Sequence, residues 1–125
     1  MDVYCFIQDA LVCEAVLRGI YYLARCNEAN QLKLGSAGAV GLIVAAMRMF
    51  FFKPHIVYYC CQCIAGLSFN NVVNADQFDE AEVADWLYKV LNMYMEHGEV
   101  VEAACHAIYA LKDLNHRMSD LCKVS

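Results

Sequence analysis

Cysteine and histidine are the residues in this sequence whose side chains could carry chemistry. The densest cluster consists of Cys60, Cys61 and Cys63. A zinc site needs thiolates that converge as spaced pairs on turns, whereas these thiols crowd one predicted helix and Cys61 points away from the other two. Cys105 and His106 are adjacent, so they face different sides of a helix and cannot pair as thiolate and imidazolium. We therefore predict no metal site, no cofactor and no catalytic residues, and we do not expect an enzyme.

The cysteines also indicate a compartment. The first residues carry Asp2 and Asp9 instead of the positive segment of a secretion signal. Most of the eight thiols lie inside apolar helical patterns, which favours reduced, small core residues over disulfides. They are Cys5, Cys13, Cys26, Cys60, Cys61, Cys63, Cys105 and Cys122. We expect a cytoplasmic protein, with the nucleus as the alternative location.

Composition excludes several classes of protein. The chain has 125 residues, of which 61% are hydrophobic and 18% charged, against roughly 45–50% and 25% in ordinary domains. Its net charge is −5 with nine Lys and Arg in all, so we expect no nucleic-acid partner. The apolar stretches 37–52 and 54–75 are interrupted by Arg48 and by several Asn and Gln side chains. The first stretch is too short to span a bilayer, and the apolar part of the second is only about twelve residues, so we predict no membrane insertion.

An internal repeat of 44 residues organises the sequence. Three positions are identical in all three copies: Ile20, Ile64 and Ile108; Leu23, Leu67 and Leu111; Asn27, Asn71 and Asn115. Other positions keep their type: Val12, Ile56 and Val100 are β-branched, and Gly19, Cys63 and Ala107 are small. Since one such unit cannot bury its apolar face alone, the copies must stack. We expect the Ile and Leu positions to form a continuous core.

Each copy is predicted to be helical. In the third copy, apolar residues recur at spacings of three and four, as on one helical stripe; they are Val101, Ala104, Cys105, Ile108 and Leu111. Pro54 suits a first helical turn, and Gly98 is expected to close the preceding helix in a left-handed conformation. Asp79 and Glu82 resemble a capping pair that opens a helix reaching about His97. Strands are not expected, because two-residue alternation is not sustained.

These residues resemble armadillo repeats. The first and second helices of that family are similar to the run NEANQLKLGSAGAVGLIVAAMRMF, and the third to EVVEAACHAIYALKDLN. The resemblance implies an all-α, right-handed α-solenoid of about three repeats in a single domain, 1–125. Its parts are a partial repeat at 1–26, a full repeat at 27–70, most of a repeat at 71–114 and the start of another at 115–125. HEAT repeats are the main competitor, but the short segment between Asn27 and Gly38 favours armadillo.

The sequence also departs from the family pattern. Armadillo proteins that hold extended peptides, such as importin alpha, use Asn and Trp side chains of the third helices. The matching Asn positions are Tyr22, Gly66 and Ala110, and the matching Trp positions are Arg18, Gln62 and His106. Nuclear-signal recognition of the importin kind is therefore not expected. The second copy has Ala81 and Glu82 where the first has Ala37 and Gly38, so we expect its corner to be made differently, through an Asp79 cap.

If third helices line a concave groove, as the resemblance implies, their exposed side chains form the candidate binding site. These residues are Arg18, Tyr22, Arg25, Tyr59, Gln62, Phe69, Glu102, His106 and Asp113, with Gly66 and Glu99 on the same surface. Residues 1–62 carry a net charge of +1 and residues 63–125 carry −6, so the acidic end would attract a basic segment. For any single residue, the alternative is a solvated side chain on an outer helix face.

Two functions fit these expectations. The first is a protein–protein interaction scaffold that binds a peptide or protein segment in the groove. The second is a structural piece that self-associates through its repeat ends, or that belongs to a longer array. Its basis is that the chain opens inside a repeat and stops after the start of another. Opposite charge bias in the two halves makes head-to-tail stacking a natural arrangement.

Overall fold

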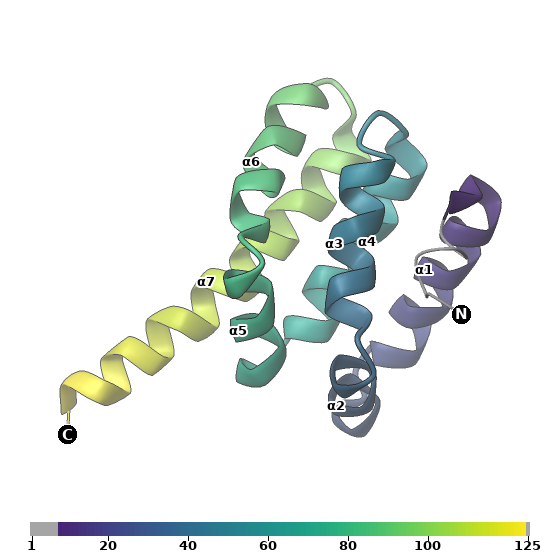
Figure 1. The fold of residues 1–125 in the computed structure, drawn as a ribbon. Coiled ribbons are helices and arrows are strands. Elements are labelled where there is room, and N and C mark those ends of the chain that lie inside the picture. Colours follow the sequence, from purple (N-terminus) through teal and green to yellow (C-terminus); the bar gives the residue numbers. More distant parts are fainter. Residues whose placement is uncertain (1–7, 125) are drawn as a thin grey trace.

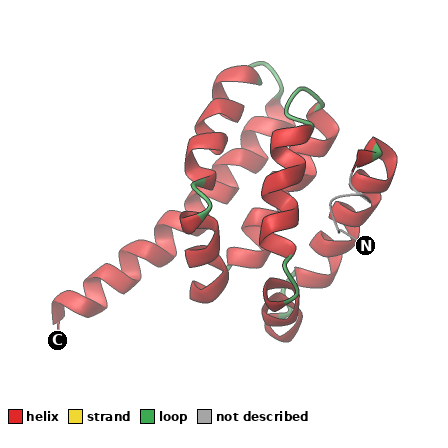
Figure 2. Cartoon of the chain, viewed as in Figure 1, coloured by secondary structure: helices red, strands yellow, loops and turns green. Residues whose placement is uncertain are grey.

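The computed structural model describes the backbone of residues 8–124 and the side chains of residues 8–112, and within this part the fold is entirely helical. Figure 2 shows helices joined by short turns, with no strand in the described residues. The predicted all-α class is confirmed. The helices are α1 (Ala10–Ala24), α2 (Glu28–Ser36), α3 (Ala39–Met49), α4 (Pro54–Ser68), α5 (Val72–Glu80), α6 (Val83–Met93) and α7 (Gly98–Val124).

Helix boundaries follow the 44-residue spacing of the sequence. The helices α4, α5 and α6 begin and end 44 residues after α1, α2 and α3, and α7 begins 44 residues after Pro54. Pro54 occupies the first turn of α4, as predicted. In each full set of three, a long helix is followed by a short one and then by one of intermediate length.

The turns before α2 and α5 are built alike. Cys26 and Asn70 both adopt a left-handed conformation, with φ of 53° and 52°. The next residue caps the helix: the side chain of Asn27 accepts the N–H of Asn30 at 2.9 Å, and Asn71 accepts the corresponding N–H at 3.0 Å. Such caps satisfy an otherwise unpaired N–H of the first helical turn. Two of the three invariant Asn positions therefore start helices.

The third invariant Asn does not start a helix. α7 continues through Asn115 to Val124, so the chain does not turn here as it does at Asn27 and Asn71, and the start of a further repeat at 115–125 stays a prediction. Leu114 stands where Cys26 and Asn70 take a positive φ, which is costly for a bulky side chain. A helical conformation avoids that cost. In Figure 1, the end of α7 extends away from the other helices.

The corner between α5 and α6 also differs from expectation. Glu82 precedes α6 in a left-handed conformation and makes no side-chain cap bond, while Asp79 lies inside α5. The predicted capping pair is therefore wrong, and the corner repeats the geometry of Gly38. Gly98 is the first residue of α7 and does not have a positive φ, so its predicted left-handed role is also wrong.

Buried amides tie the helices together. The Nε2 group of Gln31 donates to the carbonyls of Ala24 and Gly66, at 3.2 and 3.0 Å. The Nδ2 group of Asn74 donates to the carbonyls of Gln31 and Leu67, both at 2.9 Å. Because α2 thereby bonds to α1 and α4, and α5 to α2 and α4, these two short helices fix the spacing of the longer ones.

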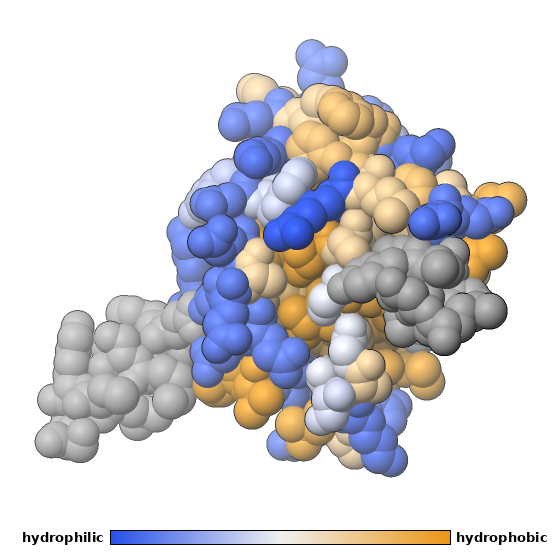
Figure 3. All heavy atoms as spheres, in the orientation of Figure 1, coloured by the Kyte–Doolittle hydropathy of each residue, from blue (hydrophilic) through white to orange (hydrophobic). Residues whose placement is uncertain are grey.

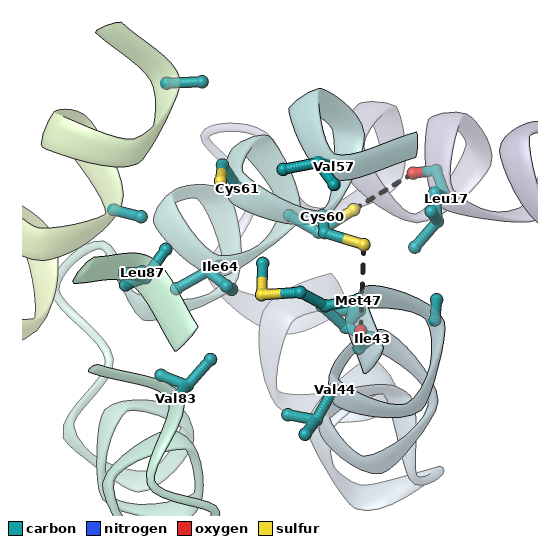
Figure 4. Packing of buried hydrophobic residues seen from close by; sticks show 14 of the residues in the cluster. Leu17, Ile43, Val44, Met47, Val57, Cys60, Cys61, Ile64, Val83 and Leu87 are labelled. Atoms are coloured by element: carbon teal, nitrogen blue, oxygen red, sulfur yellow. Dashed lines mark hydrogen bonds between the residues drawn. The ribbon is translucent and has the colours of Figure 1, made fainter. Parts of the chain in front are cut away.

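The core is formed mainly by the central helices. Ile64 and Leu67 of α4 are fully buried, and Figure 4 shows Ile64 among side chains of the neighbouring helices. At the equivalent positions of the other copies, Leu111 is buried and Ile108 is half-buried, whereas Leu23 is 55% exposed. The predicted continuous core is therefore wrong at Leu23, because no described helix covers that side of α1 (Figure 1).

The predicted apolar stripe of α7 needs a second correction. Cys105 is exposed, although its spacing predicts a core position. The buried side of the helix instead carries Val100, Ala103, Ala104, Ala107 and Leu111. Because these side chains are mostly alanine, α7 can lie close against α4.

Apolar side chains also reach the surface. Figure 3 shows them gathered over α3, beside the more hydrophilic surface of α5 and α6. No single helix among the described residues is long and apolar enough to cross a bilayer, although α2 and α3 together, bent by 72°, meet the length and composition required.

Candidate binding surface on α1, α4 and α7

Three helices lie side by side, with α4 between α1 and α7 (Figure 1). Among the described helices, the contacts of α4 with these two neighbours are the most extensive. On the α1 side, the thiol of Cys63 donates to the carbonyl of Leu17 at 3.1 Å. The guanidinium of Arg18 lies 5.8 Å from the centre of the Tyr59 ring, within the range of a cation–π contact.

A cavity of about 540 Å³ opens where the N-terminal halves of these helices meet. Carboxylates reach it from three elements: Glu14 of α1, Glu96 of the α6–α7 turn and Glu99 of α7. Its aromatic wall is formed by Tyr58 and Tyr59 of α4. The remaining lining residues are Pro54, His55, His97, Gly98 and Val100.

A second cavity, of about 260 Å³, lies between α4 and α7. It shares Tyr58 and Glu99 with the first and is otherwise lined by Gln62, Glu102, Ala103 and His106. Gln62 and Ala103 occupy the positions 44 residues after Arg18 and Tyr59. Because alanine replaces the tyrosine ring that Arg18 contacts, space remains beside Gln62. We call the two cavities together the acidic hollow.

Tyr58 separates the two parts of the acidic hollow. Its ring packs edge-to-face on Tyr59, with centroids 5.1 Å apart and planes at 79°. Its hydroxyl accepts a hydrogen bond from Nε2 of Gln62 at 2.9 Å. The phenol is therefore held at both its ring and its oxygen, which favours a preformed wall over an adaptable one.

The charged side chains that line the acidic hollow are mainly carboxylates, although Arg18 lies beside it against Tyr59. Glu14, Glu96, Glu99 and Glu102 line it, and no Lys or Arg of the described residues does so. The N-terminal ends of α4 and α7 contribute partial positive charge at the first cavity, and Glu99, in the first turn of α7, offsets it. Carboxylates beside aromatic rings are suited to an ammonium or guanidinium group.

The structure places only some of the predicted groove residues in this hollow. Tyr59, Gln62, Glu99, Glu102 and His106 line it, and Arg18 lies beside it against Tyr59. Three others, Tyr22, Arg25 and Phe69, are exposed near the C-terminal ends of α1 and α4 and line neither cavity. Gly66 is half-buried because the Tyr21 ring lies against it. A Cβ at this position would be 3.7 Å from that ring. Asp113 falls outside the described side chains.

Sequence reasoning missed several residues of the hollow. Glu14 and Tyr58 occupy the same position of the 44-residue repeat as Glu102. Comparison of the three copies could therefore have identified both as residues of the hollow. Glu96 and His97 lie in the turn before α7. Turn residues have no helical periodicity, so no sequence signal pointed to them.

The buried thiols face the core and not the hollow. Cys60 and Cys61 are fully buried, and Figure 4 shows the Cys60 thiol directed at the carbonyl of Ile43, 3.7 Å away. Burial raises the pKa of all four buried thiols above its ordinary value. The pKa is about 12 for Cys61 and about 11 for Cys13, and it is also raised for Cys60 and Cys63. These protonated thiols are poor nucleophiles and poor metal ligands.

The cysteine prediction is thus only partly met. Cys13, Cys60, Cys61 and Cys63 are free and buried, whereas Cys26 and Cys105 are free and exposed. Cys5 and Cys122 fall outside the described side chains. Within the described residues, no group of three His, Cys, Asp or Glu side chains is placed to hold a metal ion.

Comparison of the chain with protein-family models, curated proteins and solved structures finds no match in any of the three. The armadillo resemblance therefore stays a prediction.

Proposed function

We propose that this chain is a helical-repeat scaffold of the armadillo kind, which binds a basic segment of a partner protein in the acidic hollow. The repeat assignment is supported by helix boundaries that recur after 44 residues and by the matching turns at Cys26 and Asn70. The third helices of the proposed repeats are α1, α4 and α7. Solenoids generally use such rows of equivalent helices to bind other chains.

The observation that carries the proposal is the composition of the acidic hollow. Its two cavities share Tyr58 and Glu99, and carboxylates from α1, α7 and the turn before α7 line them. A lysine or arginine side chain in either cavity would meet a carboxylate and the edge or face of a tyrosine ring. Both contacts are stronger in a hollow than on an open surface, because less water competes.

The hollow also suggests the form of the ligand. Two adjacent cavities of different volume, which share Tyr58 and Glu99 in their linings, suit an extended segment that places a basic side chain in each. A compact partner would reach only the rim. The segment would be steered by long-range charge, so its binding should weaken as salt concentration rises.

A random peptide library displayed on phage tests the proposal. The chain should enrich peptides rich in Lys and Arg, and a Glu99→Gln/Glu102→Gln variant should lose that enrichment. The matched control is Asp76→Asn/Asp85→Asn, which removes the same charge from exposed positions on α5 and α6. Enrichment that is equal in all three proteins, or enrichment of acidic peptides, would contradict the proposed binding site.

The reduced thiols agree with a reducing compartment such as the cytoplasm or the nucleus, which we propose as the location. Self-association is the second candidate function. It is favoured by a different observation, the exposed apolar side chains Val12 and Leu23 of α1.

A further inference from the structure

One side of α1 is exposed although its repeat counterparts are buried. Val12 and Leu23 are 42% and 55% exposed. Their counterparts Ile56 and Leu67 on α4 are almost fully buried, as are Val100 and Leu111 on α7. Gly19 of α1 is also exposed, whereas Cys63 and Ala107 are fully buried. We call this side of α1 the entry face.

The corresponding side of α4 shows what covers such a face. The thiol of Cys63 bonds to the Leu17 carbonyl of α1, and the ring of Tyr21 lies against Gly66. On α7, the positions equivalent to Cys63 and Gly66 are Ala107 and Ala110, and both are buried. A third helix of one repeat is thus covered by the third helix of the repeat before it.

No described helix covers the opposite side of α7 either. Cys105 and Tyr109 are exposed, and Tyr109 by 70%. They are the counterparts of Leu17 and Tyr21, the residues by which α1 meets α4. We call this side of α7, within residues 98–112, the exit face.

We propose that the exit face of one copy of this chain packs on the entry face of a second copy, forming a head-to-tail assembly. The contact would repeat, between two chains, the packing of α1 on α4 and of α4 on α7. Tyr109 would then lie against Tyr22 of the second copy, which is 61% exposed. The backbone of α7 near Cys105 would approach Gly19, where the absence of a side chain permits close packing.

Charge favours this orientation over the alternatives. Residues 1–62 carry a net charge of +1 and residues 63–125 carry −6. Head-to-tail stacking brings unlike halves together, whereas contact between two exit faces would oppose two acidic halves. A heterologous contact of this kind leaves one free face at each end, so it can continue into longer assemblies. The proposal is independent of the acidic hollow, since neither Tyr22 nor Tyr109 lines it.

Light scattering over a wide concentration series, in reductant so that exposed thiols do not cross-link, tests the assembly. The average mass of the unmodified chain should rise with concentration beyond twice that of the monomer. Tyr22→Glu blocks the entry face and Tyr109→Glu the exit face, so each variant alone should stay monomeric. Val73→Glu, at an exposed position on α5, is the matched control and should assemble normally.

Mixing the two blocked variants gives the decisive result. Each retains the face that the other lacks, so an equal mixture should form a dimer and stop there. A mixture that stays monomeric would overturn the head-to-tail geometry, as would a monomeric unmodified chain at every concentration. Circular dichroism of each variant checks that the fold is retained, which is expected because both tyrosines are exposed.

Discussion

Gly38 and Glu82 lie 44 residues apart and adopt the same left-handed backbone conformation, with φ and ψ of 96° and 17° for the glycine and of 57° and 37° for the glutamate. The residues before them, Ala37 and Ala81, also match, with φ of −82° in both. Glycine adopts this conformation freely, whereas a residue with a Cβ is disfavoured there. The second corner therefore keeps the geometry of the first at a conformational cost.

Replacing Glu82 with glycine should stabilise the chain. The substitution removes the left-handed cost, which exceeds the entropy that glycine adds to the unfolded chain, so we expect a gain of about 0.5–1 kcal/mol. The reverse change, Gly38→Ala, should destabilise by about 1 kcal/mol or more. Urea unfolding of both variants measures the two effects. A loss of stability in Glu82→Gly would show that the corner is not strained.

Leu23 and Leu67 share a repeat position and should respond differently to truncation. Leu67 is fully buried and Leu23 is 55% exposed. We expect Leu67→Ala to cost about 2–5 kcal/mol, as in other packed cores, and Leu23→Ala to cost less than about 0.5 kcal/mol. Ile64→Ala, also in the buried centre, should resemble Leu67→Ala. The unfolding should be measured at low protein concentration, where assembly does not contribute. Equal costs at Leu23 and Leu67 would contradict the packing described.

Gly35 allows α2 to approach α5 closely. A Cβ at this position would clash with Oδ1 of Asn74 and would lie 2.9 Å from its Cγ. Asn74 cannot move freely, because its amide donates to two backbone carbonyls. Gly35→Ala should therefore destabilise the chain by about 1–3 kcal/mol. Gly98→Ala is the matched control, since a Cβ there would meet nothing within 4 Å; thermal melts that show equal losses would count against this contact.

The buried thiols should make the fold sensitive to alkaline pH. Their ordinary pKa is 9.0, and in the folded chain that of Cys13 is about 11 and that of Cys61 about 12. More than about one unit below pH 9 the thiols are protonated in both states and contribute no pH dependence. Between pH 9 and the folded pKa values, only the unfolded chain loses protons, so the free energy of unfolding falls as pH rises.

Urea midpoints at about pH 8 and about pH 10 measure this effect. Cys61→Ala should lower the urea midpoint at both pH values, because the substitution leaves a cavity. The decrease in midpoint from about pH 8 to about pH 10 should nevertheless be smaller in this variant than in the unmodified chain. Cys26→Ala is the control for the loss of a thiol at an exposed position. An identical drop in Cys61→Ala would contradict the assigned burial.

Much of the fold follows from sequence periodicity. The 44-residue spacing anticipates the helical class, and Asn27 and Asn71 mark two helix starts. The same pattern fails at Asn115, because the cap depends on the preceding residue: Leu114 does not favour the positive φ that Cys26 and Asn70 adopt. Position in a repeat also does not reveal whether a neighbouring helix is present, so the repeat pattern alone wrongly predicts Leu23 to be a core residue.

The acidic hollow was less predictable than the row of helices that carries it. Periodicity identifies an exposed stripe, and Gln62, Glu102 and His106 were found in this way. The space between them arises because Ala103 is smaller than its counterpart Tyr59, a difference between two helices that no single-helix pattern shows. Glu96 enters from a turn, whose path depends on how α6 and α7 pack.

The central claim is that the acidic hollow binds basic side chains, and an NMR titration tests it most directly. The ¹⁵N-labelled chain would be titrated with a short peptide of alternating lysine and glycine, and with its glutamate counterpart as control. We predict that the lysine peptide shifts the amide resonances of Tyr58, Tyr59, Glu99 and Glu102, with smaller changes on α3 and none from the glutamate peptide. Shifts confined to other helices, or none with the lysine peptide at low salt, would contradict the account.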